Sequence, residues 1–365
     1  MLESVIRDRA RAEKVIVLLG ARQVGKATLI RSMFGGDDSV LWLSGDESEV
    51  RALFEDADPT RLRAMIGGKT TVVIDEAQRV ADIGVKLKLI TDQMPDVRLV
   101  TTGSLPFDTG GPPAERSREL VLYPMSFEER AARHGRLDEV RLTPRRLVYG
   151  CYPEVVASPG NETEVLRGLC DNYLYKDILA LNKIRKYESM ARLLKALASQ
   201  IGSKVSYCEL GVTCGLDSKT VEKYVMVLEE AYIVFRLGTF ARRIRNELKI
   251  SRKVFFVDNG VRNALISDFR PAEEREDIGQ LWENFMISER VKRNSYRGGP
   301  INSWFWRTRL KREIDYIEER NERFSAYEFK WNPAAKAKVP RPFPAAYPNS
   351  DFTVVHPDNF VDFLL

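Results

Sequence analysis

Short apolar runs alternate with amphipathic stretches along the first third of the chain. The runs are rich in Val, Ile, Leu and Thr and are bounded by polar residues or glycine; they lie at 15–19, 70–75 and 97–102. Continuous apolar runs of this length are typical of strands buried on both faces of a parallel sheet. Helical spacing appears between them, at 29–33, 48–54 and 80–93. We therefore expect an α/β domain with a parallel sheet, helices on both faces, and a ligand at the carboxyl ends of the strands.

The middle of the chain has a different pattern. Apolar residues at 188–201 follow helical spacing, and 205–214 predicts a short helix with a turn that contains glycine. Asp217 is a capping residue for a further helix at 217–230, which is expected to bury Val221, Tyr224, Val225 and Leu228. Strand patterns follow at 232–240 and 253–257. Helix, turn, helix and a pair of strands predict a winged helix.

The last third predicts a second α/β domain. A helix is expected at 278–294, and alternating or aromatic strand patterns lie at 301–307, 313–318, 324–330 and 351–356. The predicted organisation is thus an α/β domain at 1–135, a helical connector at 136–184, a winged helix at 185–260, and a second α/β domain at 261–365.

Composition narrows the class of protein. The 365 residues are 44% hydrophobic and 30% charged, which is ordinary for a globular protein of two or three domains. The longest apolar run, 15–19, has five residues, and 1–11 has no apolar signal-peptide core. The four cysteines form no CxxC pair. We expect a cytoplasmic protein without a membrane segment, a disulfide framework or a zinc site.

The first strand leads into a phosphate-binding loop. The sequence reads Gly20, Ala21, Arg22, Gln23, Val24, Gly25, Lys26, Ala27, Thr28. Strand, G-x-x-x-x-G-K and helix form the context of a P-loop, in which backbone amides surround phosphates and the lysine reaches the β- and γ-phosphates. A coincidental glycine loop is the alternative. A nucleotide with Mg²⁺ is the expected ligand.

Ala27 departs from the P-loop pattern. The residue after the lysine is normally Ser or Thr, whose hydroxyl holds Mg²⁺. Thr28 lies about 100° further round the helix and is poorly aimed as a substitute. Nucleotide binding is expected to survive this change, whereas retention of the metal, and therefore hydrolysis, is in question.

Polar side chains end the next two apolar runs. Asp75 and Glu76 follow the run at 70–75, where Asp75 is expected to hold the metal and Glu76 to activate the attacking water. A helix cap is the alternative for this acidic pair. Ser104 follows the run at 97–102 and is either a sensor of the γ-phosphate or a turn serine.

These motifs, in this order, resemble a family of prokaryotic AAA-type ATPases that join a P-loop domain to a winged helix and a domain similar to restriction endonucleases. The matching strings include 20–26, 73–78, 102–104, 122–127, 150–154, 175–177, 256–260, 313–315 and 328–330. The resemblance implies ATP as the nucleotide. It also implies an arginine finger before the Leu-Tyr-Pro segment, which is Arg116 or the nearby Arg118. Such a finger would act on a neighbouring subunit, so a homo-oligomer is implied; a surface ion pair is the alternative.

Basic residues in the middle of the chain suggest DNA as a partner. Lys219 and Lys223 lie four residues apart on the second predicted helix, and 236–253 contains seven basic residues and one acid. Such a cluster suits phosphate contacts through counterion release. A lid or a subunit contact is the competing role for this region.

The last third carries a second group of carboxylates. Glu328 and Lys330 are two residues apart on one face of a strand, and Asp315 lies on the neighbouring antiparallel strand. Glu283, near the start of the long helix, adds a ligand. With the family context this set is similar to the PD-(D/E)xK nuclease core, in which two carboxylates hold Mg²⁺ and the lysine orients water. The stretch 290–312 has eight basic residues and no acid, so DNA is expected beside this set.

The expected function is an ATP-dependent switch with ATPase activity that is coupled to DNA or partner binding. The alternatives are a nucleotide-gated DNA-binding module that does not hydrolyse ATP, and a metal-dependent nuclease.

Overall fold

The chain forms two compact units in a computed structural model that describes residues 2–10, 13–55, 58–108, 117–171, 187–240, 252–298, 301–308 and 312–365. Unit 1 comprises residues 1–123 together with 230–232, and unit 2 comprises 124–229 and 233–365. Within the described residues, no helix has both the length and the apolar character needed to span a membrane.

Unit 1 is built on a parallel five-stranded sheet in the order β2-β3-β4-β1-β5. The strands are β1 (Val15–Leu19), β2 (Val40–Ser44), β3 (Thr71–Asp75), β4 (Arg98–Gly103) and β5 (Ser117–Val121). The three predicted strands are confirmed as β1, β3 and β4. Strands β2 and β5, which the apolar pattern did not predict, flank them; β2 is only partly buried after Val40.

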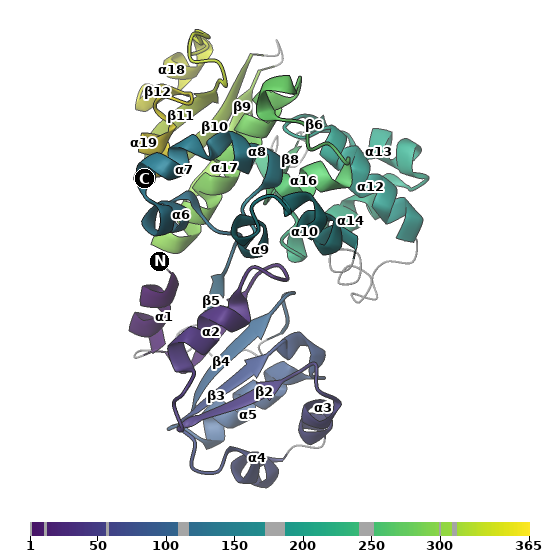
Figure 1. Cartoon of the computed structure of the whole chain (residues 1–365), viewed down its shortest axis with the longest axis vertical. Coiled ribbons are helices and arrows are strands. Elements are labelled where there is room, and N and C mark those ends of the chain that lie inside the picture. The colour runs from purple at the N-terminus through teal and green to yellow at the C-terminus, as the bar shows by residue number, and fades with distance from the viewer. Residues whose placement is uncertain are drawn as a thin grey trace. The chain divides into compact units, whose positions relative to one another are not determined.

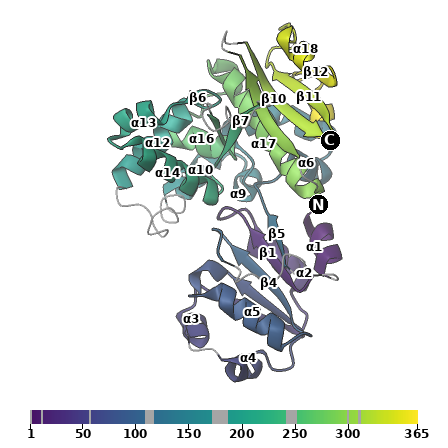
Figure 2. The ribbon, with the colours of Figure 1, turned by 180° about the vertical axis from the view of Figure 1, so that it is seen from behind.

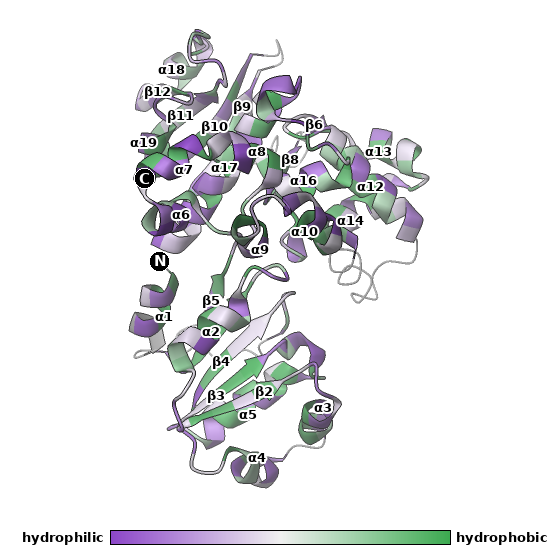
Figure 3. Cartoon of the chain, viewed as in Figure 1, coloured by the Kyte–Doolittle hydropathy of each residue, from purple (hydrophilic) through white to green (hydrophobic). Residues whose placement is uncertain are grey.

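Helices cover both faces of this sheet, as the pattern predicts. They are α1 (Leu2–Ala10), α2 (Lys26–Phe34), α3 (Ser48–Glu55), α4 (Pro59–Ile66) and α5 (Ile83–Gln93), with a 3-10 turn at Ala77–Arg79. Figures 1 and 2, seen from opposite sides, show α2 in front of the sheet in one view and α5 in front of it in the other. The predicted helix at 80–93 begins three residues later, because the 3-10 turn precedes it. Figure 3 shows β3 as a hydrophobic strand, in keeping with its complete burial from Thr71 to Ile74.

Unit 2 begins with short helices. They are α6 (Phe127–His134), α7 (Arg136–Arg141), α8 (Thr143–Tyr149), α9 (Pro153–Ala157) and α10 (Glu162–Leu169). Ser126 caps α6 in a capping box with Glu129, which fixes where this helix starts. Further along are α12 (Tyr187–Ser199), α13 (Tyr207–Cys214), α14 (Ser218–Glu230), α16 (Asn259–Leu265), a 3-10 turn (Ala272–Glu274), α17 (Ile278–Arg297), α18 (Pro342–Ala346) and α19 (Phe360–Leu364).

A seven-stranded mixed sheet runs through unit 2 in the order β12-β11-β10-β9-β7-β8-β6. Its strands are β6 (Lys204–Val205), β7 (Val234–Thr239), β8 (Arg252–Phe256), β9 (Asn302–Arg307), β10 (Glu313–Arg320), β11 (Arg323–Phe329) and β12 (Ser350–Val355). Strand β7 pairs with β8 on one side and, in parallel, with β9 on the other. One sheet therefore includes strands from both regions that the sequence assigns to separate domains.

The middle segment has the element order expected for a winged helix. Helix α12 is followed by β6, then by α13 and α14, and then by the antiparallel pair β7 and β8. The four residues predicted to be buried on α14 are buried. The assignment of this segment as a winged helix stays a prediction.

Long-range packing in unit 2 centres on α17. Trp282, Phe285, Met286 and Ile287 of this helix lie in one core with Phe305, Tyr316 and Phe329 of the sheet. Trp282 contributes a fully buried ring, edge-on to Phe360 at 5.5 Å between centroids. Burial on this scale is the dominant stabilising contribution to a fold.

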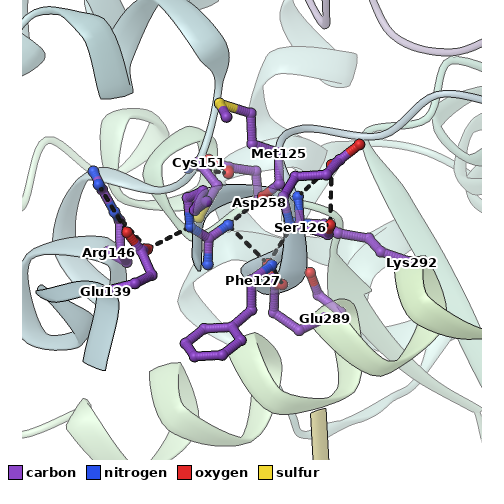
Figure 4. Close-up of polar contacts among 12 residues, drawn as sticks. Met125, Ser126, Phe127, Glu139, Arg146, Cys151, Asp258, Glu289 and Lys292 are labelled. Carbon is purple, nitrogen blue, oxygen red and sulfur yellow. Dashed lines mark hydrogen bonds and ion pairs between the residues drawn. The ribbon is translucent and has the colours of Figure 1, made fainter. Parts of the chain in front are cut away.

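A buried ionic network joins segments of unit 2 that are far apart in the sequence (Figure 4). Arg130 is completely buried; its Nε donates to Glu139 at 2.5 Å, and its Nη1 donates to the carbonyl of Met125 and lies 3.4 Å from Glu289. Lys292 donates to the same Glu289 oxygen at 2.8 Å. We call these four charged side chains, Arg130, Glu139, Glu289 and Lys292, the Arg130 network.

Backbone groups complete this region. The amide of Phe127, at the start of α6, donates to Glu289, and the amide of Cys151 donates to Asp258 at 2.7 Å. Opposite charges hold the pKa of Glu139 and Glu289 below the ordinary value despite burial, whereas burial raises the pKa of the Cys151 thiol to about 12. The carboxylates are therefore ionised and paired, and Cys151 is an unreactive thiol.

Candidate functional site

The loop between β1 and α2 has the backbone of a phosphate-binding loop. Gly20 and Gly25 adopt positive φ angles of 146° and 98°, and Gln23 adopts 60°. A Cβ on Gly20 would lie 2.1 Å from the carbonyl oxygen of Leu122, so only glycine fits there. Helix α2 starts at Lys26 without a side-chain cap, which leaves its N-terminal amides directed at the loop.

Lys26 is held by neutral groups of this loop. Its Nζ donates to the carbonyls of Gly20 at 2.8 Å and Ala21 at 2.9 Å, and it lies 3.9 Å from a carboxylate oxygen of Glu76. The side chain is 5% exposed. The P-loop lysine and the second acid of the acidic pair, predicted to share one site, are thus brought together.

The acidic pair lies at the carboxyl end of β3, next to β4. Ile74 is paired with Thr101, so the residues that follow each of them are also neighbours. The hydroxyl of Thr102 donates to Asp75, and the amide of Glu76 donates to the same hydroxyl at 3.1 Å. Glu76 has a left-handed backbone, with φ of 49°, which turns its side chain away from the direction of the strand.

Ser104 and Gln78 hold the carboxylate of Glu76. Ser104 Oγ donates to Glu76 Oε2 at 3.1 Å, and Gln78 Nε2 donates to the same oxygen at 2.6 Å and to Ser104 Oγ at 2.9 Å. Ser104 is buried at the end of β4, which places it at Glu76. Gln78 belongs to the string 73–78, but the sequence analysis gives it no role. Its position two residues after Glu76 is the feature of the sequence that could have identified it.

A cavity of about 170 Å³ opens beside Ala27. Ala27 lines it together with Asp75, Ser44, Glu47 and Thr102, among others. Thr28 is exposed and does not line this cavity, in keeping with its place one residue further round the helix. The space beside Asp75 has the oxygen donors that Mg²⁺ prefers.

The predicted arginine finger falls in a part of the chain that the structure leaves out. Arg116 lies outside the described residues, as does the string 175–177. Arg118 is on β5, opposite Ile16 of β1, and is exposed.

The second predicted site is also assembled, with two additional members. We call Glu283, Glu313, Asp315 and Glu328, with Lys253 and Lys330, the carboxylate cluster. Lys330 Nζ lies 2.8 Å from Glu328, and the amide of Phe329 donates to Asp315 at 3.0 Å. The predicted members Glu283, Asp315, Glu328 and Lys330 are close enough to perturb one another's ionisation.

Lys253 of β8 lies within this cluster, which the sequence pattern did not predict. Its Nζ is 2.9 Å from Glu283 of α17 and 2.6 Å from Glu313 of β10, and the side chain is 3% exposed. It also lies 5.5 Å from the centre of the Phe305 ring. The linear charge pattern placed Lys253 in a basic run, because the acids that it pairs with are 30 and 60 residues away.

Burial raises the pKa of three carboxyls in the cluster. The pKa of Glu283 rises to about 8, because burial and the charge of Asp315 outweigh the attraction of Lys253. Burial also raises the pKa of Asp315, and burial with the charge of Asp315 raises that of Glu328. The pKa of Lys253 is raised despite burial, because Glu283, Asp315 and Glu313 surround it.

The side chains of five of the six basic residues that the structure describes in 290–312 contact protein groups. Arg290 is paired with Glu318 at 2.7 Å, Lys292 with Glu289, Arg297 with Glu128 and Arg307 with Glu313, while Arg293 donates to the carbonyl of Leu365. Trp306 is buried edge-on against Phe343. Much of the basic stretch is thus engaged within unit 2, whereas Lys219 and Lys223 of α14 are exposed, as predicted.

Three family models match successive parts of the chain. Residues 12–131 match an AAA domain, 140–272 match a domain of unknown function (DUF8612), and 278–362 match another domain of unknown function (DUF4143). The N-terminal part is therefore a P-loop ATP-binding domain of the AAA type, in agreement with its parallel sheet and its loop geometry.

Curated relatives and solved structures resemble most of the chain at low identity. An uncharacterized protein of Mycobacterium tuberculosis is 26% identical over 87% of this chain and 70% of its own length. An uncharacterized protein of Haemophilus influenzae is 26% identical over 55% of this chain and 50% of its own length. A Walker-type ATPase of Pyrococcus abyssi has 14% identity and a TM-score of 0.47, over 73% of this chain and 95% of that chain.

Proposed function

We propose that the protein is an ATPase that acts as a nucleotide-dependent switch and that its C-terminal regions engage DNA or a partner according to the nucleotide state. The observation that carries the ATPase proposal is the position of Lys26, which lies between two loop carbonyls and Glu76 at the start of α2.

The loop residues bind and orient the nucleotide in this proposal. Lys26 exchanges its carbonyl contacts for phosphate oxygens, which attract an ammonium group more strongly because they are charged. The α2 amides and the residues 20–28 surround the phosphates. Asp75 and the oxygen donors beside Ala27 would hold Mg²⁺, which when bound neutralises charge on the phosphates.

Glu76 acts as the base or polariser of the attacking water. Ser104 and Gln78 both donate to one of its oxygens, so its other oxygen, which lies 3.9 Å from Lys26, is the one directed at the loop. Two donors on a carboxylate fix its orientation, which a group that accepts a proton from a positioned water requires.

Ala27 supports a second candidate function, a nucleotide-gated module that binds ATP without turning it over. The cavity beside Ala27 lacks the hydroxyl that normally completes the magnesium site at this position. Because Mg²⁺ readily keeps several waters, a water in this space is enough for hydrolysis in the leading proposal.

Coupling to DNA is proposed for the segment from α12 to β8. Lys219 and Lys223 are exposed on α14, where they are available to phosphates. Assembly into a homo-oligomer, with Arg116 acting on a neighbouring subunit, is the corresponding proposal for the finger residue.

Nucleotide binding and phosphate release test these proposals separately. Lys26→Ala is expected to weaken binding of a fluorescent ATP analogue at least about tenfold, whereas Lys88→Ala, an exposed change on α5, is expected to leave it unchanged. The ATPase proposal is supported if the protein releases radioactive phosphate from [γ-³²P]ATP and the Glu76→Gln variant does not. Binding without release supports the module, and no saturable binding contradicts both.

A further inference from the structure

The carboxylate cluster of unit 2 resembles a metal site in its acids but not in its charge balance. A nuclease core of this kind needs carboxylate oxygens that are open to a divalent cation. Here the oxygens of Glu283 and Glu313 face the ammonium group of Lys253, which contacts both and is almost fully buried.

The other acids of the cluster are also engaged. Glu328 pairs with Lys330, Asp315 accepts the backbone amide of Phe329, and the second oxygen of Glu313 pairs with Arg307 at 2.6 Å. Three cationic side chains therefore contact carboxylates of this cluster. Among the residues that the structure describes, no three acidic, histidine or cysteine side chains are arranged to hold a metal ion.

The backbone of Lys253 is held in place by the sheet, and its side chain is buried. It lies within β8, which is paired with both β7 and β6, so its backbone is fixed by two neighbouring strands. The ring of Phe305 lies 5.5 Å from the ammonium group and limits the space around it. If the ammonium group of Lys253 broke its contacts with Glu283 and Glu313, it would remain buried without charged partners, which costs free energy.

We infer that the ammonium group of Lys253 takes the place of the divalent cation in this nuclease-like site, so that the cluster is a metal-independent ion group that joins β8, α17 and β10. Glu283 and Glu313 each direct a carboxylate oxygen at Lys253, so these oxygens are not open to a magnesium ion while Lys253 is present. On this inference the C-terminal region does not cleave DNA, and its acids serve to hold three elements together.

Removing the ammonium group tests whether it stands in a cation's place. Lys253→Met keeps most of the side-chain volume but removes the charge, so the acids it faced become available to Mn²⁺. Full-length proteins that all carry Asp75→Asn, to exclude metal at the P-loop, would be titrated with Mn²⁺ and free Mn²⁺ measured by electron paramagnetic resonance. Nucleotide is left out throughout.

The expected result is a gain of binding. Lys253→Met should bind one Mn²⁺ per chain at least about tenfold more tightly than the parent protein, and Mn²⁺ should raise its melting temperature. Adding Glu283→Gln should abolish the gain. Arg252→Met, on the neighbouring position of β8 where the arginine pairs with Glu222 at the surface, and Lys253→Arg, which keeps a cation, should both behave as the parent.

Two results would overturn the inference. One is metal chemistry in the parent protein. This would be tight binding of one Mn²⁺ per chain that Glu283→Gln abolishes, or nicking of plasmid in Mg²⁺ that Lys330→Ala abolishes. The other is a folded Lys253→Met protein, checked by circular dichroism, that gains no Mn²⁺ binding. If Lys253→Met does not fold, the parent and Lys330→Ala measurements still decide.

Discussion

Lys26 and Lys253 are both nearly buried, and the groups that hold them differ. Lys26 of the P-loop donates to two neutral carbonyls and lies 3.9 Å from a carboxylate oxygen of Glu76. Lys253 of β8 contacts two carboxylates, at 2.9 Å and 2.6 Å. Both ammonium groups are nearly buried, so burial alone does not distinguish a binding lysine from a structural one.

The acids around the two lysines differ in the same way. Asp75 and Glu76 are held by the hydroxyls of Thr102 and Ser104 and by the amide of Gln78, which orient a carboxylate without neutralising it. In the carboxylate cluster, Glu283, Glu313 and Glu328 contact cations, and Asp315 accepts a backbone amide. A carboxylate that accepts hydrogen bonds from neutral donors keeps its negative charge available to a cationic ligand. A carboxylate that is paired with a lysine or arginine is already neutralised.

The largest expected effect is on ATP turnover, which should depend on the acidic pair of the P-loop site and not on the carboxylate cluster. Glu76→Gln should lower the turnover rate by about 10² to 10⁴, because general-base catalysis contributes on that scale. Asp315→Asn, in the carboxylate cluster, should leave turnover within about twofold. Steady-state phosphate release measures both. A similar loss from the two variants would show that the sites are not independent.

The next effect concerns the Arg130 network, a second group in which buried charges are mutually paired. Arg130→Met should reduce the free energy of unfolding by about 3–5 kcal/mol, because Glu139 and Glu289 lose a buried partner. Urea unfolding followed by circular dichroism measures the change. Arg133→Met, an exposed change on the same helix, is the control and should cost less than about 0.5 kcal/mol.

Glu283 gives the carboxylate cluster a dependence on pH. Its folded pKa of about 8 is above the ordinary value of 4.5, so the folded state keeps a proton that the unfolded state has released between these pH values. Stability from this group is complete below pH 4.5 and is lost as the pH rises to 8, by at most about 1.4 kcal/mol per pH unit.

Replacing this carboxyl should therefore flatten the profile. Glu283→Gln should gain stability relative to the wild type as the pH rises from about 5 to about 8, measured by urea midpoints at each pH. Glu273→Gln, an exposed change before the same helix, should follow the wild type. A relative loss of stability with rising pH would contradict the expected sign.

The smallest effect concerns Ala27. Ala27→Thr should raise magnesium-dependent hydrolysis by about tenfold, or about 1.4 kcal/mol, because the added hydroxyl enters the cavity that Ala27 and Asp75 line. Single-turnover phosphate release at limiting Mg²⁺ measures it. Thr28→Ala should have no effect, and an equal change in both variants would mean that the cavity is not where the metal is held.

Most of the strands and both acid groups were predictable from local patterns. The P-loop and the acidic pair each follow a buried strand, and alternation placed Glu328 and Lys330 on one face. Strand β5 was missed because Ser117, Arg118 and Glu119 interrupt its apolar pattern. Strand β2 is apolar from Val40 to Leu43, so its omission has no such cause. Gln78 was missed because a side chain that only orients another has no motif of its own.

Long-range charge pairing was beyond the sequence. Lys253 and Arg290 read as members of basic runs, yet each is buried against an acid from a distant part of the chain. Which acid faces which base depends on the strand order and on the packing of α17, and neither follows from charge along the chain. The sequence predicts DNA beside residues 290–312, whereas much of this stretch is paired with groups of unit 2.

The shared sheet of unit 2 has a practical consequence for dissecting the protein. A fragment that starts after residue 260 would lack β7, the strand that pairs with β9 through Gly238 and Thr239. Strand β9 would then become a free edge that carries Trp304, Phe305 and Trp306, and such an edge recruits other chains and aggregates. Fragments meant to remain in solution should therefore start upstream of β6.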